Sequence, residues 1–208
     1  NYTYHTFNPG INVIKINYSE ENSQNDLKID TSYGNYGVYA HELYFYAEDD
    51  VEITERFKIN IGAHFSTFIV KKKNYYSLQP RISMRYLLTE NLSFKASVVQ
   101  MTQYVQLLST ANIGLPTDLW VPATDKIAPM KSWQYSTGVA YSPNDMYEFS
   151  IETYYKPLYN IIEYKEGASF VSINNSWENK VESGKGWDKG IEFLINTKTG
   201  KINGWIGY

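Results

Sequence analysis

A regular alternation of apolar and polar residues is the feature that most constrains the fold of this 208-residue chain. In one segment, for example, Phe57, Ile59 and Ile61 alternate with Lys58 and Asn60. A two-residue repeat is typical of a β-strand with one apolar and one polar face. The segments run for about ten residues, the length that a tilted strand needs to cross a bilayer, whereas strands of soluble proteins most often have about five or six. The alternating segments are 57–66, 80–88, 92–98, 133–141, 147–156 and 190–195.

The connections between these segments alternate between short and long. Short turns are expected at 54–56, 89–91, 142–145 and 197–200, and long connections at 9–40, 69–77, 105–131 and 157–186. Outer-membrane barrels have the same asymmetry, with short periplasmic turns and longer outer loops. We therefore predict an all-β fold, an antiparallel up-and-down meander that forms part of a large transmembrane β-barrel. Residues 1–208 are expected to be a fragment of about nine strands, with both ends cut within strands.

Aromatic residues make up 16% of the chain, and many Tyr and Trp lie near the ends of the expected strands. Such residues form girdles at the two membrane interfaces of a barrel. The candidate girdle residues are Tyr75, Tyr76, Tyr86, Trp133, Tyr141, Tyr147, Tyr154 and Tyr155.

The alternation is disturbed in two places. After Val98 and Val99 the parity changes, which predicts a β-bulge near the outer rim. Asp49 falls in the apolar row of its segment, so either it reaches the membrane interface or a bulge shifts it.

Composition excludes several classes of function. The chain has no Cys, which removes disulfides, thiolate metal sites and a cysteine nucleophile. With 19 basic and 22 acidic residues it has no field that would attract nucleic acid. Glu148 and Glu152 lie about 13 Å apart along one strand face, beyond the roughly 5–9.5 Å of glycosidase carboxyl pairs. The three histidines have no metal-ligand spacing. We therefore expect no enzyme activity, catalytic residue, cofactor or metal site.

One block of the sequence is not explained by periodicity. It contains Leu-Pro-Thr-Asp-Leu-Trp-Val-Pro at 115–122, a Pro at 129, a strand with Gly138 near its middle, Glu-Thr-Tyr-Tyr-Lys at 152–156, and Asn-Ile-Ile-Glu-Tyr-Lys-Glu-Gly at 160–167. This block resembles the barrel of TonB-dependent outer-membrane receptors of Gram-negative bacteria. Looser matches extend the resemblance from about residue 42 to residue 208.

The resemblance implies an active-transport receptor in the outer membrane that imports an iron complex, vitamin, glycan or peptide with TonB-coupled energy. Its implied partners are outer-membrane lipid, its own plug domain, which is absent here, and the TonB–ExbB–ExbD complex, which the missing N-terminal part would engage. Whether a surface lipoprotein joins the barrel stays open.

Five residues are candidates for ligand binding in the outer loops and the lumen: Asp118, Trp120, Tyr154, Arg81 and Arg85. Trp120 has two readings, a loop anchor over the barrel mouth or a stacking surface for cargo. Because the resemblance gives its motif to the family while cargo differs between members, we favour the anchor. The lumen charges are expected to face one another or water rather than cargo.

The alternative fold is a secreted or surface β-sandwich that binds carbohydrate or protein. Nine long strands with unpaired edges and an apolar face would aggregate in water, which argues against it.

Overall fold

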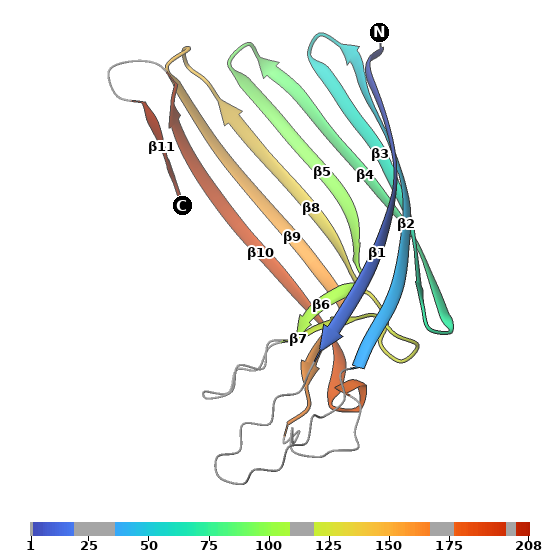
Figure 1. The fold of residues 1–208 in the computed structure, drawn as a ribbon. Helices are drawn as coiled ribbons and strands as arrows, with labels where there is room; N and C mark the ends of the chain where they lie inside the picture. The colour runs from blue at the N-terminus through green and yellow to red at the C-terminus, as the bar shows by residue number, and fades with distance from the viewer. Residues whose placement is uncertain (1, 19–35, 109–118, 167–176, 199–202) are drawn as a thin grey trace.

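The computed structural model describes residues 2–18, 36–108, 119–166, 177–198 and 203–208. In these ranges the chain forms one curved antiparallel sheet of nine strands, in the order β1-β2-β3-β4-β5-β8-β9-β10-β11 (Figure 1). The strands are β1 (Tyr2–Tyr18), β2 (Tyr36–Thr54), β3 (Phe57–Val70), β4 (Lys73–Thr89), β5 (Leu92–Gln103), β8 (Met130–Tyr141), β9 (Tyr147–Tyr164), β10 (Val181–Thr197) and β11 (Gly204–Gly207). Strands adjacent in this sheet follow one another along the chain, which is an up-and-down meander. The sheet does not close on itself, so β1 and β11 are its two edges.

Two further elements lie outside this sheet. The strands β6 (Val105–Leu108) and β7 (Leu119–Pro122) form a separate two-stranded hairpin, and η1 (Trp177–Asn179) is a 3-10 turn before β10. Within the described residues no helix is long and apolar enough to cross a membrane. The structure does not have the alternative β-sandwich fold, because the large sheet has no second large sheet packed against it in the described part of the chain.

The large sheet has one apolar and one polar face. The strand register sets Ile61 opposite Ile82 and Asn60 opposite Ser83, so odd and even residues of β3 lie on different faces. The apolar row is exposed: Ile61 keeps 50% of its surface accessible and Ile151 keeps 53%. An apolar face this large and uncovered is typical of a surface that meets lipid or a partner. Its aliphatic members include Ile59, Ile61, Ile82, Met84, Val98, Val139, Ile151 and Ile191.

Aromatic residues bound this apolar face at both ends. Phe57, Tyr86, Phe94, Tyr141, Tyr147 and Phe149 lie toward the short turns, and Tyr76, Trp133, Tyr135, Tyr155 and Trp187 toward the long loops. Tyr86 and Tyr76 are separated along β4 by about 33 Å at ~3.3 Å per residue, or about 25 Å along the normal of a membrane crossed at ~40°. This is the height of the apolar band of an outer-membrane barrel, about 25 Å. Of the expected girdle residues, Tyr75 and Tyr154 instead lie on the polar face.

The connections depart from the expected alternation at the loop end. Residues 69–77 are not a long connection, because β3 runs to Val70, β4 begins at Lys73, and Lys71 turns the chain with a left-handed φ of 48°. The β9 and β10 strands likewise extend well into 157–186. These four strands continue beyond the apolar band, because polar residues can still form the backbone hydrogen bonds between neighbouring strands.

The two disturbances in the alternation are not bulges. β5 pairs with β8 without a register shift from Leu92 to Gln103, so the bulge expected after Val99 was wrong. The last pair between β4 and β5 is Arg81 with Val99, and the polar residues that begin at Gln100 come after it. Asp49 stands directly opposite Ile61, so it remains in the apolar row.

Candidate functional site

The β6–β7 hairpin crosses the hollow of the curved sheet. Its strand β7 contacts β1 and its strand β6 contacts β9, although β1 and β9 lie six places apart in the sheet order. An element can touch two such distant strands only from the concave side of the sheet. Figure 1 shows the hairpin at the end of the sheet that carries the long loops.

The hairpin and the residues next to it, 104–108 and 119–129, form an inward segment. Its first anchor is on β3. The ring of Tyr104 stacks on that of Phe68, with centroids 4.7 Å apart and planes 3° from parallel. The Tyr104 hydroxyl also lies 2.8 Å from Ser66 Oγ, within hydrogen-bond distance. Ser66 and Phe68 belong to the polar row of β3. The polar face therefore lines the hollow, and the apolar face points outward.

This first anchor is largely shielded from water. Phe68, Val70 and Ala123 are buried with Tyr104 in one cluster. Burial raises the pKa of the Tyr104 phenol, which lies between β5 and β6 at the loop end. Tyr75 on β4 adds a hydrogen bond from its hydroxyl to the Thr124 carbonyl oxygen.

The second anchor is on β9, at Asn160. This residue has a left-handed φ of 60° and no partner in the β9–β10 ladder, whose register shifts at this point. Asn tolerates that conformation better than most residues. Its Nδ2 donates to the Pro129 carbonyl oxygen at 2.9 Å, and its own carbonyl accepts from Gln106 Nε2 at 3.5 Å. An apolar cluster packs beside it, formed by Leu108, Val121, Ile127, Ile162, Trp177 and Val181.

A buried carboxylate joins three segments at the same end. The Glu178 side chain in η1 is only 6% exposed and lies 3.9 Å from Lys71 Nζ and 3.5 Å from Lys126 Nζ. Lys71 comes from the β3–β4 turn and Lys126 from the segment after β7. Glu178 thus links the inward segment to the rim of the sheet.

One face of the hairpin stays open. Trp120 stands opposite Leu107 in the β6–β7 ladder and is 56% exposed, whereas its neighbour Val121 is buried. Alternation along the hairpin explains this, since adjacent strand residues point to opposite faces. Leu108 and Val121 are buried and hold the hairpin in place from its other face. Asp118 lies outside the described residues.

The other three candidate residues lie on the concave face but do not form a single site. The Arg81 guanidinium carbon is 5.7 Å from the ring centroid of Tyr46, and its Nη1 lies 3.9 Å from a Glu48 oxygen. The ring of Tyr154 lies so close over Gly190 that a Cβ there would meet it at 2.7 Å. Arg85 lies apart from both, in a hollow of about 370 Å³ nearer the short turns.

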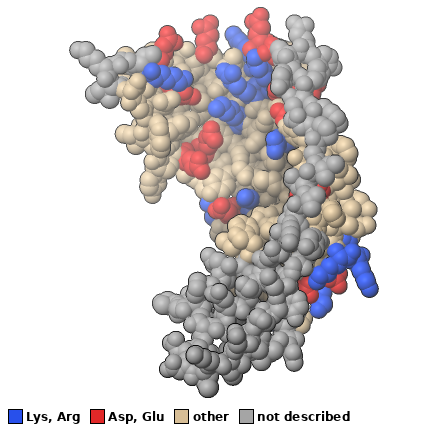
Figure 2. Space-filling view, viewed as in Figure 1, with Lys and Arg blue, Asp and Glu red and all other residues tan. Residues whose placement is uncertain are grey.

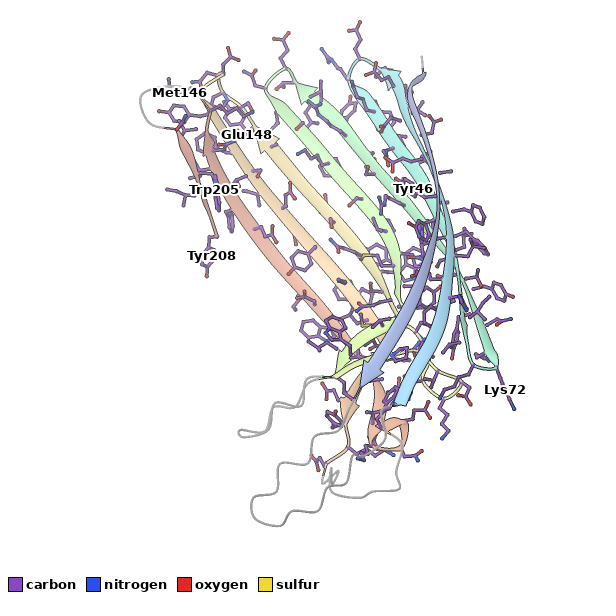
Figure 3. The ribbon with its side chains drawn as sticks, in the orientation of Figure 1. Tyr46, Lys72, Met146, Glu148, Trp205 and Tyr208 are labelled. Carbon is purple, nitrogen blue, oxygen red and sulfur yellow. The ribbon has the colours of Figure 1, made fainter. Side chains whose placement is uncertain are left out.

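Other lumen charges pair along the wall rather than across it. Lys198 Nζ lies 2.6 Å from a Glu148 oxygen, and the Lys58 ammonium contacts Glu52 on the neighbouring strand. Figure 3 shows Glu148 near the short-turn end of the sheet. The described residues contain no group of three or more His, Asp or Glu that could hold a metal ion.

Known structures share this fold. The FrpB iron transporter from Neisseria meningitidis, as apoprotein, superposes with a TM-score of 0.61 at 13% identity, over 98% of this chain and 33% of that one. The copper transporter OprC gives a TM-score of 0.58 at 12% identity, over 94% of this chain and 32% of that one. The ferric-catecholate import receptor Fiu from E. coli gives 0.55 at 13% identity, over 79% of this chain and 26% of that one. This chain thus spans between a quarter and a third of the length of these structures.

No curated protein sequence matches this chain. The family model described as "TonB dependent receptor-like, beta-barrel" matches residues 1–208, the whole length of the chain. The fold class predicted from the sequence is therefore confirmed, as is the placement in the outer membrane of a Gram-negative bacterium. The chain belongs to the TonB-dependent receptor β-barrel family.

Proposed function

We propose that residues 1–208 form part of the barrel wall of an outer-membrane receptor that imports a nutrient with TonB-coupled energy. The complete receptor would add further strands to both sheet edges, a plug domain inside the barrel and a segment that engages the TonB–ExbB–ExbD complex. Barrels of this kind have about 22 strands around a plugged lumen. Nine strands would then be less than half of the wall.

The observation that carries this proposal is the curved sheet with an exposed apolar outside and a charged inside. A soluble receptor would have no use for an outward row in which residues such as Ile61 and Ile151 are half exposed. The match of the family model to all 208 residues supports the same reading.

We propose the open face of the hairpin as a contact surface for cargo. Trp120 and Leu107 are exposed together at the loop end, where a molecule arriving from outside the cell would first meet the receptor. A flat aromatic ring can stack on a sugar, a catecholate or a macrocycle. The similar structures are named for iron, ferric catecholate and copper, so a metal complex is the first cargo class to test. We also propose that cargo contacts Asp118 in the loop and three residues in the lumen: Arg81, Arg85 and Tyr154.

The test is uptake by cells that carry the full-length receptor as their only importer of the labelled compound. The compounds would be a ferric catecholate, Cu²⁺, cobalamin and an oligosaccharide, each with and without a protonophore. We expect one of them to enter only while the proton gradient is intact. Recovery of the full-length protein from the soluble fraction, without detergent, would refute the proposal.

Trp120→Ala separates the two readings of this residue. If Trp120 contacts cargo, uptake falls at least about tenfold, the loss of roughly 1.4 kcal/mol of binding, while the amount of folded receptor is unchanged. The matched control is Trp187→Ala, because Trp187 is similarly exposed but lies on the outward face. Equal uptake by the two variants would mean that Trp120 is not a cargo contact.

A further inference from the structure

Three lysines lie on the outward face of the sheet, at the end that carries the long loops. Lys131 on β8 and Lys185 on β10 both pair with Tyr159 on β9, so the two lysines flank this ring in the strand register. Lys189 is four residues further along β10 on the same face, and all three lysines are exposed. They are the only Lys or Arg residues on the outward face of β3, β4, β5, β8, β9 and β10, which the structure describes throughout.

Aromatic rings position two of these lysines. Lys189 Nζ lies 4.8 Å from the ring centroid of Trp187, and Lys185 Nζ lies 5.8 Å from that of Tyr159. A cation within about 6 Å of the centroid of an aromatic ring is attracted to the face of the ring. Trp187 is two residues nearer the loops than Lys189, so the Lys189 ammonium is directed away from the apolar band.

The height of these lysines corresponds to the headgroups of a membrane. Trp133 and Trp187 belong to the aromatic residues that bound the apolar face at the loop end. Lys131 and Lys185 are each two residues nearer the loops, about 7 Å further along their strands at ~3.3 Å per residue. Aromatic residues of this kind lie at the level of the headgroups, and the long loops of a barrel are on the outside of the cell. The three lysines therefore face the headgroups of the outer leaflet.

The outward lysines lack the carboxylates that accompany the cations of the lumen. In the lumen, Lys58, Arg85 and Lys95 form a row through the strand register. Glu52 contacts Lys58, and Glu152 lines the same hollow as Arg85 and Lys95. Figure 2 shows Lys and Arg atoms beside Asp and Glu atoms in this view of the molecule.

On the outward face, by contrast, the charge has a single sign. The outward residues of β8, β9 and β10 include no Asp or Glu. Within the described part of the chain, none of the three outward lysines forms an ion pair. A cluster of positive charge at the edge of the lipid-facing surface is complementary to an anionic headgroup.

We propose that Lys131, Lys185 and Lys189 bind the phosphate groups of a phosphorylated lipid in the outer leaflet. This inference rests on the proposed function, in which residues 1–208 are part of the barrel wall. An ammonium group binds phosphate as a point charge, without the fixed geometry that an Arg requires. Lys131 and Lys185 approach one headgroup from two strands, and the acyl chains of the same lipid lie along the apolar face beside it.

Lipid A, a glycolipid with two phosphates, is the probe for this surface. The full-length receptor in an uncharged detergent is mixed with lipid A, and native mass spectrometry gives the fraction of receptor that carries it. The test variant combines Lys131→Gln, Lys185→Gln and Lys189→Gln. We expect it to bind lipid A about a hundredfold more weakly than the wild type, since each Lys near an anionic lipid surface contributes roughly fivefold.

Two further variants are matched to this one. Replacing the same three lysines by Arg keeps the positive charge, so lipid A should bind as it does to the wild type. Replacing Lys58, Lys95 and Lys156 by Gln removes the same amount of charge from the lumen-facing side, and binding should again be unchanged. Lipid A from which both phosphates have been removed should bind the wild type as weakly as intact lipid A binds the Gln variant.

The inference is overturned if the wild type and the outward Gln variant bind lipid A equally, or if the phosphate-free lipid binds the wild type as tightly as intact lipid A. Displacement of lipid A by inorganic phosphate would also overturn it, because the lysines would then hold a free anion rather than a lipid. If the Gln variant does not fold, the comparison of the two lipids on the wild type decides. The outcome is separate from that of the proposed function: a receptor that imports cargo and binds lipid A independently of these lysines contradicts only the lipid site.

Discussion

The Tyr104 ring lies flat on the Phe68 ring, and this stack joins the inward segment to the barrel wall. Phe68 is in the lumen-facing row of β3, whereas Tyr104 is the first residue after β5. The stack is fully buried at Phe68 and nearly so at Tyr104. The described parts of this segment, residues 104–108 and 119–129, are thus a fixed part of the concave face, attached to β3 on one side and to β9 on the other.

Loss of the stack should release the inward segment. Truncation of a buried aromatic side chain costs about 3–5 kcal/mol, so Tyr104→Ala should increase local opening more than about a hundredfold. Tyr104→Phe keeps the stack and loses only the Ser66 hydrogen bond, about 1 kcal/mol or roughly fivefold. Trypsin cleavage after Lys126, in the receptor embedded in membranes, measures this opening. Equal cleavage of both variants would show that the stack does not hold the segment.

Asn160 should contribute through both its amide and its backbone. Asn160→Gly permits the left-handed φ but removes the hydrogen bond to Pro129, which costs about 1 kcal/mol. Asn160→Ala also strains the backbone and should cost about 1 kcal/mol more. We expect trypsin cleavage after Lys126 to be slowest in the wild type, faster in Asn160→Gly and fastest in Asn160→Ala. The reverse order of the two variants would mean that residue 160 does not need the left-handed conformation.

Glu178 should contribute more to stability than an exposed carboxylate in the same region. Glu178→Gln removes the countercharge of Lys71 and Lys126, and we expect a loss of about 1 kcal/mol, because both lysines are half exposed and can be solvated instead. Glu166→Gln is the control, since Glu166 is exposed. The two variants are compared by titration with guanidinium, which measures the free energy of opening the segment that Glu178 holds. A Glu178→Gln variant as stable as the control would contradict a joining role.

Charge on the outward face should be far more costly than charge in the lumen. Ile61 stands opposite Ile82, which lies near the midpoint between Tyr86 and Tyr76. Lys at the midplane of the lipid face costs about 2–4 kcal/mol, so Ile61→Lys should destabilise the barrel by that amount. Asn60→Lys, one residue away on the lumen side, should cost well under half as much. Urea unfolding of the full-length receptor in lipid vesicles gives both values, and equal costs would contradict the assignment of faces.

The sequence predicts the wall of this fold better than its interior. Period-two alternation assigned Ile61 and Ile151 to the apolar face and Arg81 and Arg85 to the polar face, because alternation depends only on local geometry. The inward hairpin was missed, because β6 and β7 are only four residues each and their burial depends on contacts with distant strands.

The candidate site shows the same division. The Asp-Leu-Trp-x-Pro block singles out this loop in the sequence, but only the hairpin register shows that Trp120 is exposed and Val121 buried. Asn160 could have been noticed, since an Asn that follows a long alternating strand is a common left-handed residue. The row formed by Lys58, Arg85 and Lys95 could not, because its members come from three strands and meet only through the register.

The most direct test of the membrane assignment is a spin-label scan of residues 57–65 on β3 and 147–155 on β9 in the full-length receptor, reconstituted in lipid. Collision with oxygen reports lipid exposure, and collision with a water-soluble nickel complex reports water exposure. We predict that oxygen accessibility peaks at every odd-numbered residue of both strands and falls at every even-numbered one. Uniform accessibility to the nickel complex along both strands would contradict a transmembrane wall.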